Sequence, residues 1–102
     1  METLDGMSEG LHKARSGLIR VLVKVEDCRI RDLIISGDFI IVPEASIDMM
    51  EGSLIGSSIS EEEIIAKLRR FFQTNAFQSP GASPEDFALA IMKAISGGKK
   101  HG

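Results

Sequence analysis

Two short polar segments hold the residues whose types and spacing could do chemistry. The first, His12-Lys13-Ala14-Arg15, leads into Ser16-Gly17. Its cations could reach a phosphate or carboxylate in a neighbouring protein's site, or they could form an ion-paired surface rim. The second is Gly37-Asp38, which lies between two apolar runs. The Asp38 carboxylate could cap backbone N–H groups across a bend, or it could hold a basic group of a partner.

The common catalytic and metal-binding arrangements are missing from the sequence. Cys28, the single cysteine, falls in a predicted turn with no histidine close in sequence. His12 and His101 have no second donor at a metal-ligand spacing. The residues from Gly97 to Lys100 follow a predicted helix instead of opening one, as a phosphate loop would. We therefore predict neither a catalytic residue nor a metal site on this chain.

Charge is separated along the sequence, although the formal net charge is only −3. Six basic and two acidic residues lie between Leu11 and Arg31, whereas the span from Asp32 to Ala66 holds eight acids and no Lys or Arg. Such polarisation favours steering toward a partner or an anionic ligand. The net negative charge and the lack of Trp and Tyr argue against a nucleic-acid module.

Three strands are predicted to position these segments. Alternating apolar residues indicate a strand over Ile19–Val25 and a return strand over Ile30–Ser36, joined by a tight polar turn. The apolar residues of the return strand change parity, which a bulge near Arg31-Asp32 would reconcile. After Gly37, a third strand is expected over Phe39–Val42.

Three helices follow in the sequence. The first is expected to begin at Pro43 and end near Gly56, and the second begins at Ser60, which is followed by three acids. The third opens at Ser83-Pro84 and is expected to stop at Gly97-Gly98. This order predicts an α+β fold, with a three-stranded antiparallel sheet followed by three helices packed on one face.

Length and composition predict a single domain. With 102 residues, 43% of them hydrophobic and 26% charged, the chain resembles an ordinary globular protein. No apolar run approaches the roughly 18 residues of a membrane span, and a single cysteine suits the reducing cytoplasm. We expect a flexible arm over residues 1–10 (starting at Met1 or Met7), the domain over 11–96, and a flexible tail over 97–102.

Several of these motifs together resemble the C-terminal accessory domain of lipoate–protein ligases, which in some archaea is a separate small subunit. The resemblance spans Leu11 to Ser96. It rests on His12-Lys13, Gly17, Leu18-Ile19-Arg20-Val21, Ile35-Ser36-Gly37-Asp38-Phe39, Pro43-Glu44 and Leu54-Ile55-Gly56. Ser16-Gly17 stands where the family often has a glycine pair, and Ile40 stands where it often has an aromatic residue.

The resemblance implies a noncatalytic accessory subunit that works with the catalytic subunit of a two-chain ligase. The complex would use ATP, with Mg²⁺, to convert lipoate to lipoyl-AMP. It would then transfer the lipoyl group to a lysine of the acceptor lipoyl domain of a 2-oxoacid dehydrogenase complex. No cofactor, nucleic acid or membrane is expected to bind this chain alone. The residues expected near the partner or the nucleotide are His12, Lys13, Arg15, Gly17, Gly37 and Asp38.

The family's catalytic chain carries an Arg-Arg and Gly-Gly-Gly motif and an essential lysine, and no such motif occurs in this sequence. The order of elements also resembles iron–sulfur scaffold and sulfur-acceptor proteins, but these need reactive cysteines and only Cys28 is present. A small protein-interaction or scaffold module unrelated to lipoate is the remaining alternative.

Overall fold

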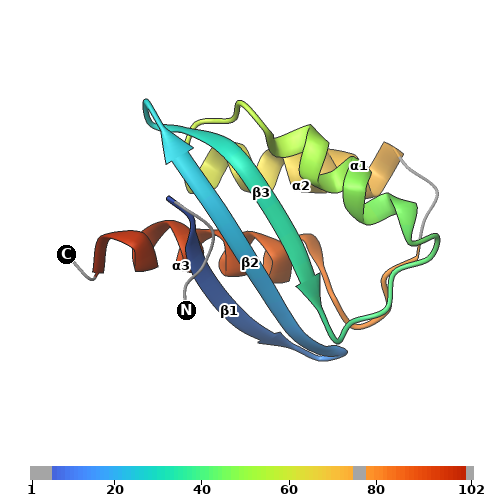
Figure 1. Ribbon diagram of the computed structural model, residues 1–102. Helices are drawn as coiled ribbons and strands as arrows, with labels where there is room; N and C mark the ends of the chain where they lie inside the picture. The colour runs from blue at the N-terminus through green and yellow to red at the C-terminus, as the bar shows by residue number, and fades with distance from the viewer. Residues whose placement is uncertain (1–5, 75–77, 101–102) are drawn as a thin grey trace.

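The chain forms one antiparallel sheet with its helices on a single face (Figure 1). The computed structural model describes residues 6–74 and 78–100, and the strands follow the order β1-β2-β3. The strands are β1 (Ser8–Ala14), β2 (Gly17–Glu26) and β3 (Arg29–Gly37), and the helices are α1 (Ala45–Leu54), α2 (Glu61–Thr74) and α3 (Pro84–Lys100). The predicted α+β class is confirmed.

The hairpin of β2 and β3 contains the predicted bulge. Lys24 pairs with Asp32, whereas Val25 pairs with Ile30, so Arg31 is the extra residue on β3. A bulge residue shifts the strand by one position and turns the following side chains to the other face. The bulge therefore lets the apolar residues on both sides of it face the helices and become buried.

The structure differs from the sequence prediction at β1, because Ser8–Gly10 belong to this strand and not to a flexible arm. Residues 1–5 lie outside the described residues. The positions of β1 that face α3 are small or polar: Ser8, Gly10, His12 and Ala14. A Cβ at Gly10 would lie only 2.3 Å from the backbone nitrogen of Ala94 in α3. Because α3 approaches so closely, the strand lacks the large apolar residues that signal a strand in sequence.

The predicted strand over Phe39–Val42 is wrong. Only Val42 forms a β-bridge, in which its N–H and carbonyl each bond to Gln78 at 2.9 Å. The outer edge of β3 is not free to pair with this segment, because the Ile35 N–H donates to the Glu51 carboxylate of α1 at 2.8 Å. The segment therefore leaves the sheet and runs beside the stretch that precedes α3.

Two predicted helix boundaries also change. Helix α1 begins at Ala45 with Glu44 as its N-cap, so Pro43 precedes the helix instead of opening it. Helix α3 continues through Gly97 to Lys100, which removes most of the predicted tail, and residues 101–102 lie outside the described residues. A Cβ at Gly97 would lie 3.1 Å from the Glu9 carbonyl oxygen, so glycine there permits close packing of α3 on β1.

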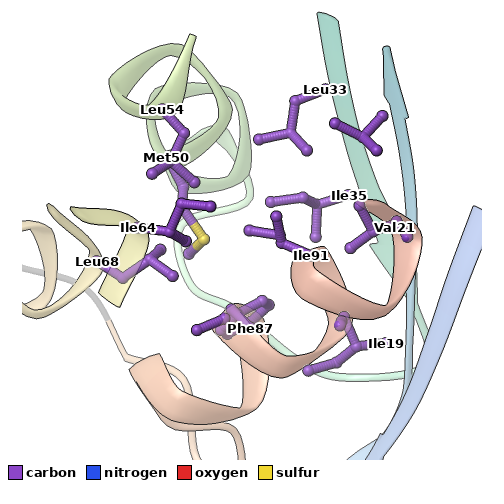
Figure 2. Close-up of a cluster of buried hydrophobic side chains, with 14 of the residues drawn as sticks. Ile19, Val21, Leu33, Ile35, Met50, Leu54, Ile64, Leu68, Phe87 and Ile91 are labelled. Atoms are coloured by element: carbon purple, nitrogen blue, oxygen red, sulfur yellow. The ribbon is translucent and has the colours of Figure 1, made fainter. Parts of the chain in front are cut away.

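The core lies between the sheet and the helix layer. Figure 2 shows side chains from β2, β3 and all three helices converging there. The labelled residues, all buried, are Ile19, Val21, Leu33, Ile35, Met50, Leu54, Ile64, Leu68, Phe87 and Ile91. These side chains come from β2, β3 and all three helices, and they hold α3 across the sheet with its first turn near the turn between β1 and β2 (Figure 1).

Candidate functional site

One end of the sheet brings together the segments that the sequence analysis singled out. The turn that joins β1 and β2 lies there, next to the segments that follow β3 and precede α3 (Figure 1). The Ser16 N–H donates to the Gly81 carbonyl at 3.1 Å, and the Asp38 N–H donates to the Leu18 carbonyl at 2.9 Å. Three parts of the chain that are distant in sequence therefore form one continuous surface.

A hollow of about 610 Å³ opens at this end, between the end of β1 and the first turn of α3. We call it the β1–α3 hollow. Its lining residues are His12, Lys13, Ala14, Arg15, Ser79, Gly81, Ala82, Ser83 and Asp86. Three of the six residues predicted near a partner or nucleotide, namely His12, Lys13 and Arg15, thus line one cavity.

His12 and Asp86 join the two walls of the hollow, with Nε2 of His12 2.9 Å from the Asp86 carboxylate. The same carboxylate accepts hydrogen bonds from the N–H and the hydroxyl of Ser83, whose hydroxyl in turn accepts from the Asp86 N–H. This reciprocal arrangement is a capping box at the start of α3. Partial burial opposes ionisation of Asp86, but the bonds from Ser83 and His12 together outweigh it and lower the carboxyl pKa. His12 therefore has a structural bond that fixes β1 on α3.

Lys13 and Arg15 are exposed on the rim of the hollow. Within the described part of the chain, neither side chain forms an ion pair or a hydrogen bond, so the ion-paired rim considered from sequence is not found. Asp86, the one acid among the lining residues described, is already bonded to His12 and Ser83. The rim therefore presents two cations that no described residue pairs with, and lysine and arginine are well suited to phosphate or carboxylate oxygens.

Gly17, Gly37 and Asp38 lie beside the hollow but outside its lining. A Cβ at Gly17, where φ is +142°, would lie 3.0 Å from the Asp38 Cβ, and one at Gly37 would lie 2.0 Å from the Leu18 carbonyl oxygen. Both glycines thus allow the chain to pass closely at the end of the sheet. The Asp38 carboxylate has no hydrogen bond or ion pair to any residue the structure describes, so the predicted cap across the bend is absent.

Sequence reasoning missed the wall of the hollow that residues 79–86 supply. The Ser83-Pro84-Glu85-Asp86 pattern predicts a helix start, and it gave no signal that Asp86 would meet a histidine 74 residues away. Gly81 packs so closely on the turn that a Cβ there would lie 2.7 Å from the Ser16 Cβ. Only the tertiary fold brings these residues together.

Neither Cys28 nor a metal-binding group of the described residues adds to this site. Cys28 is exposed in the turn between β2 and β3, at the opposite end of the sheet from the β1–α3 hollow. Among residues 6–74 and 78–100, no group of three His, Cys, Asp or Glu side chains is arranged to hold a metal ion. No helix in these residues is long and apolar enough to cross a membrane.

Comparisons with known proteins identify one family. Residues 9–91 match the family described as the C-terminus of bacterial lipoate protein ligase. The chain is 46% identical over 79 residues to lipoate-protein ligase A subunit 2 of Thermoplasma acidophilum. These 79 residues are 78% of this chain and 81% of that protein.

A solved structure gives a similar match. It is of a bi-partite lipoate protein ligase and its E2 lipoyl domain, from the archaeal lipoylation system of T. acidophilum. The match has a TM-score of 0.76 and 44% identity, and it covers 83% of this chain and 93% of that one.

Proposed function

The chain belongs to the family of lipoate protein ligase C-terminal domains, and we propose that it is the noncatalytic accessory subunit of a two-chain lipoate–protein ligase. Its partner is the catalytic subunit. The complex activates lipoate with ATP and Mg²⁺ in the cytoplasm, forming lipoyl-AMP and pyrophosphate. The lipoyl group then passes to a lysine amine of an acceptor lipoyl domain, with release of AMP. The similarity to one subunit of a bi-partite ligase supports this assignment.

We assign the accessory chain to the first of these two reactions, the formation of lipoyl-AMP. In this step the lipoate carboxylate attacks the α-phosphate of ATP, so two anions must approach one another. Positioned cations and exclusion of water lower the barrier to such a reaction. The second step starts from the mixed anhydride, which is already activated, and requires less charge stabilisation. A subunit that supplies cations is therefore of most use during activation.

The observation that carries the proposal is the pair of cations on the rim of the β1–α3 hollow. Lys13 and Arg15 are exposed and without ion pairs to the residues described, while the Asp86 carboxylate in the same hollow is already bonded. Their charges are therefore available to an anion outside this chain. In the proposal, the catalytic subunit holds the nucleotide and these two side chains approach its phosphates from the accessory side.

The test compares single variants at the rim with a matched arginine elsewhere. Lys13→Ala and Arg15→Ala should each slow lipoyl-AMP formation by about 10- to 150-fold, the equivalent of losing one hydrogen bond to a charged group, about 1.5–3 kcal/mol. Transfer from preformed lipoyl-AMP should change little. Arg31→Ala removes an exposed arginine at the opposite end of the sheet and should leave both steps unchanged.

Lipoyl-AMP is quantified by chromatography with the catalytic subunit in complex with each variant. Saturating amounts of the accessory chain separate a chemical defect from weakened binding. If both rim variants support activation at the wild-type rate, the cations take no part in the reaction. A purely structural role of the subunit would then replace the proposed one.

A further inference from the structure

The segment that follows β3 exposes two aliphatic side chains that the fold does not account for. Ile40 is 61% exposed and Val42 is 55% exposed, the two highest values among the large hydrophobic residues described. Their neighbours Phe39 and Ile41 point the other way, since Ile41 is buried and Phe39 packs against the core. The segment is thus extended, with one apolar side facing the core and one facing outward.

This outward apolar side is continuous with the β1–α3 hollow. Val42 forms its β-bridge with Gln78, which directly precedes Ser79 in the lining of the hollow. At the start of the segment, Asp38 packs against Gly17 in the turn that carries Arg15. A partner that covers Ile40 and Val42 would therefore lie next to the cations of the rim.

A second hollow lies beside this segment, and a side chain of the same partner could enter it. Its volume is about 380 Å³, and its walls include Phe39, Ile40 and Ile47. Because Ser36 and Glu44 also line this hollow, it would receive a partner side chain with both an apolar body and a polar end, in the manner of interfaces that pair protruding anchors with pockets.

The outer face of the sheet is a weaker candidate for the same role. Its apolar residues Leu11, Leu18 and Ile34 are 46%, 38% and 40% exposed, respectively, so each is more covered than Ile40 or Val42. Arg20 pairs with Leu11 across the strands and forms an ion pair with Glu9 on this face. Apolar residues divided by charged ones are normal for the solvent face of an antiparallel sheet.

We propose that Ile40 and Val42 are the apolar anchors that dock this chain on the catalytic subunit. This inference rests on the proposed function, which requires a catalytic partner whose site meets the rim at Lys13 and Arg15. Docking through the neighbouring segment brings that rim to the partner. The partner surface has an apolar socket for the two anchors and, next to it, the bound anionic nucleotide.

The experiment measures binding of the catalytic subunit to Ile40→Ser, to Val42→Ser and to the double variant by calorimetry. Each single change should raise the dissociation constant about 10-fold, and the double change about 100-fold, because each removes an aliphatic group buried in the complex. Ile34→Ser, on the outer face of the sheet, is the matched control and should bind like the wild type. Circular dichroism and thermal unfolding should show that all the variants fold, because the replaced side chains are exposed.

Activation assays separate this inference from the proposed function. At saturating accessory chain, the anchor variants should form lipoyl-AMP at the wild-type rate, since Lys13 and Arg15 remain in place. If the anchor variants bind with wild-type affinity, or if Ile34→Ser weakens binding as much as they do, the docking proposal is overturned. It is equally overturned if the chain forms a dimer that these changes dissociate while affinity for the catalytic subunit stays constant. If the anchors are needed for binding but Lys13→Ala and Arg15→Ala leave activation unchanged, only the proposed role of the cations fails.

Discussion

Replacement of Gly10 by alanine tests the packing of β1 on α3. This packing determines the position of Lys13 and Arg15 on the rim of the β1–α3 hollow. The added Cβ would lie 2.3 Å from the Ala94 nitrogen and 2.6 Å from the Ala90 carbonyl oxygen. Both are backbone atoms of α3, so they cannot rotate aside as a flexible side chain can. The strand and the helix must separate by about 1 Å to reach the 3.4 Å at which ordinary contact begins.

The expected loss of stability has two parts. Overpacking of a well-packed interior costs about 1–3 kcal/mol. A shift of this size also disrupts the hydrogen bond from the Ser8 hydroxyl to the Ala94 carbonyl, now 2.8 Å long, which adds about 0.5–1.5 kcal/mol. A total of about 2–4 kcal/mol is a large share of the 5–15 kcal/mol typical of a domain. At roughly 4–8 °C per kcal/mol for a domain of this size, the melting temperature should fall by about 10–30 °C.

Thermal unfolding of the full chain, followed by circular dichroism, measures the effect. Gly52→Ala is the matched control, because a Cβ at this exposed position of α1 has no heavy atom within 4 Å. Alanine should stabilise that helix by about 0.5–1 kcal/mol. If Gly10→Ala melts within about 2 °C of the wild type, β1 does not pack on α3 as described.

Three further changes test particular interactions by urea or thermal unfolding. Asp86→Asn should cost about 1–2 kcal/mol at pH 7 by weakening the cap with Ser83. The pKa of Asp86 in the folded chain lies below the ordinary 3.8, so the stability that the ionised carboxylate contributes is lost as the pH falls through that folded pKa. If Asp86→Asn destabilises the chain at pH 2 as much as at pH 7, this reasoning is contradicted. Burial raises the pKa of Glu51, so its ionisation costs stability as the pH rises through the folded value. Glu51→Gln keeps an acceptor for the Ile35 N–H, and it should be more stable than the wild type at pH 8 and equal to it at pH 3. Cys28 has a φ of +61°, which is strained for a residue with a Cβ but not for glycine. Cys28→Gly should therefore raise the free energy of unfolding by about 0.5–1 kcal/mol, and a melting temperature below that of the wild type would refute this.

Local patterns in the sequence predicted the central hairpin and the three helices. The alternation of β-branched residues in β2 and the changed parity of Ile30 were sufficient to place both strands and the bulge. Strand β1 gave no such signal because Gly10 and Ala14 occupy its buried positions, where α3 leaves no room for larger residues. Phe39–Val42 is an unbroken apolar run of the length of a short strand, but the edge of β3 is already occupied.

The candidate site was predicted only in part, for a related reason. Lys13 and Arg15 are visible in sequence as a basic segment before a strand. That neither forms an ion pair with a described residue depends on what the fold brings near, and so does the contact of His12 with Asp86. Contacts between residues this far apart follow from tertiary packing and leave no local pattern.

The most direct test of the central claim measures lipoyl-AMP formation by the catalytic subunit with and without this chain, beside lipoyl transfer from preformed lipoyl-AMP. The account predicts that activation requires the chain, while transfer proceeds in its absence. If activation runs at the same rate without the chain, its assignment as the activation subunit is contradicted.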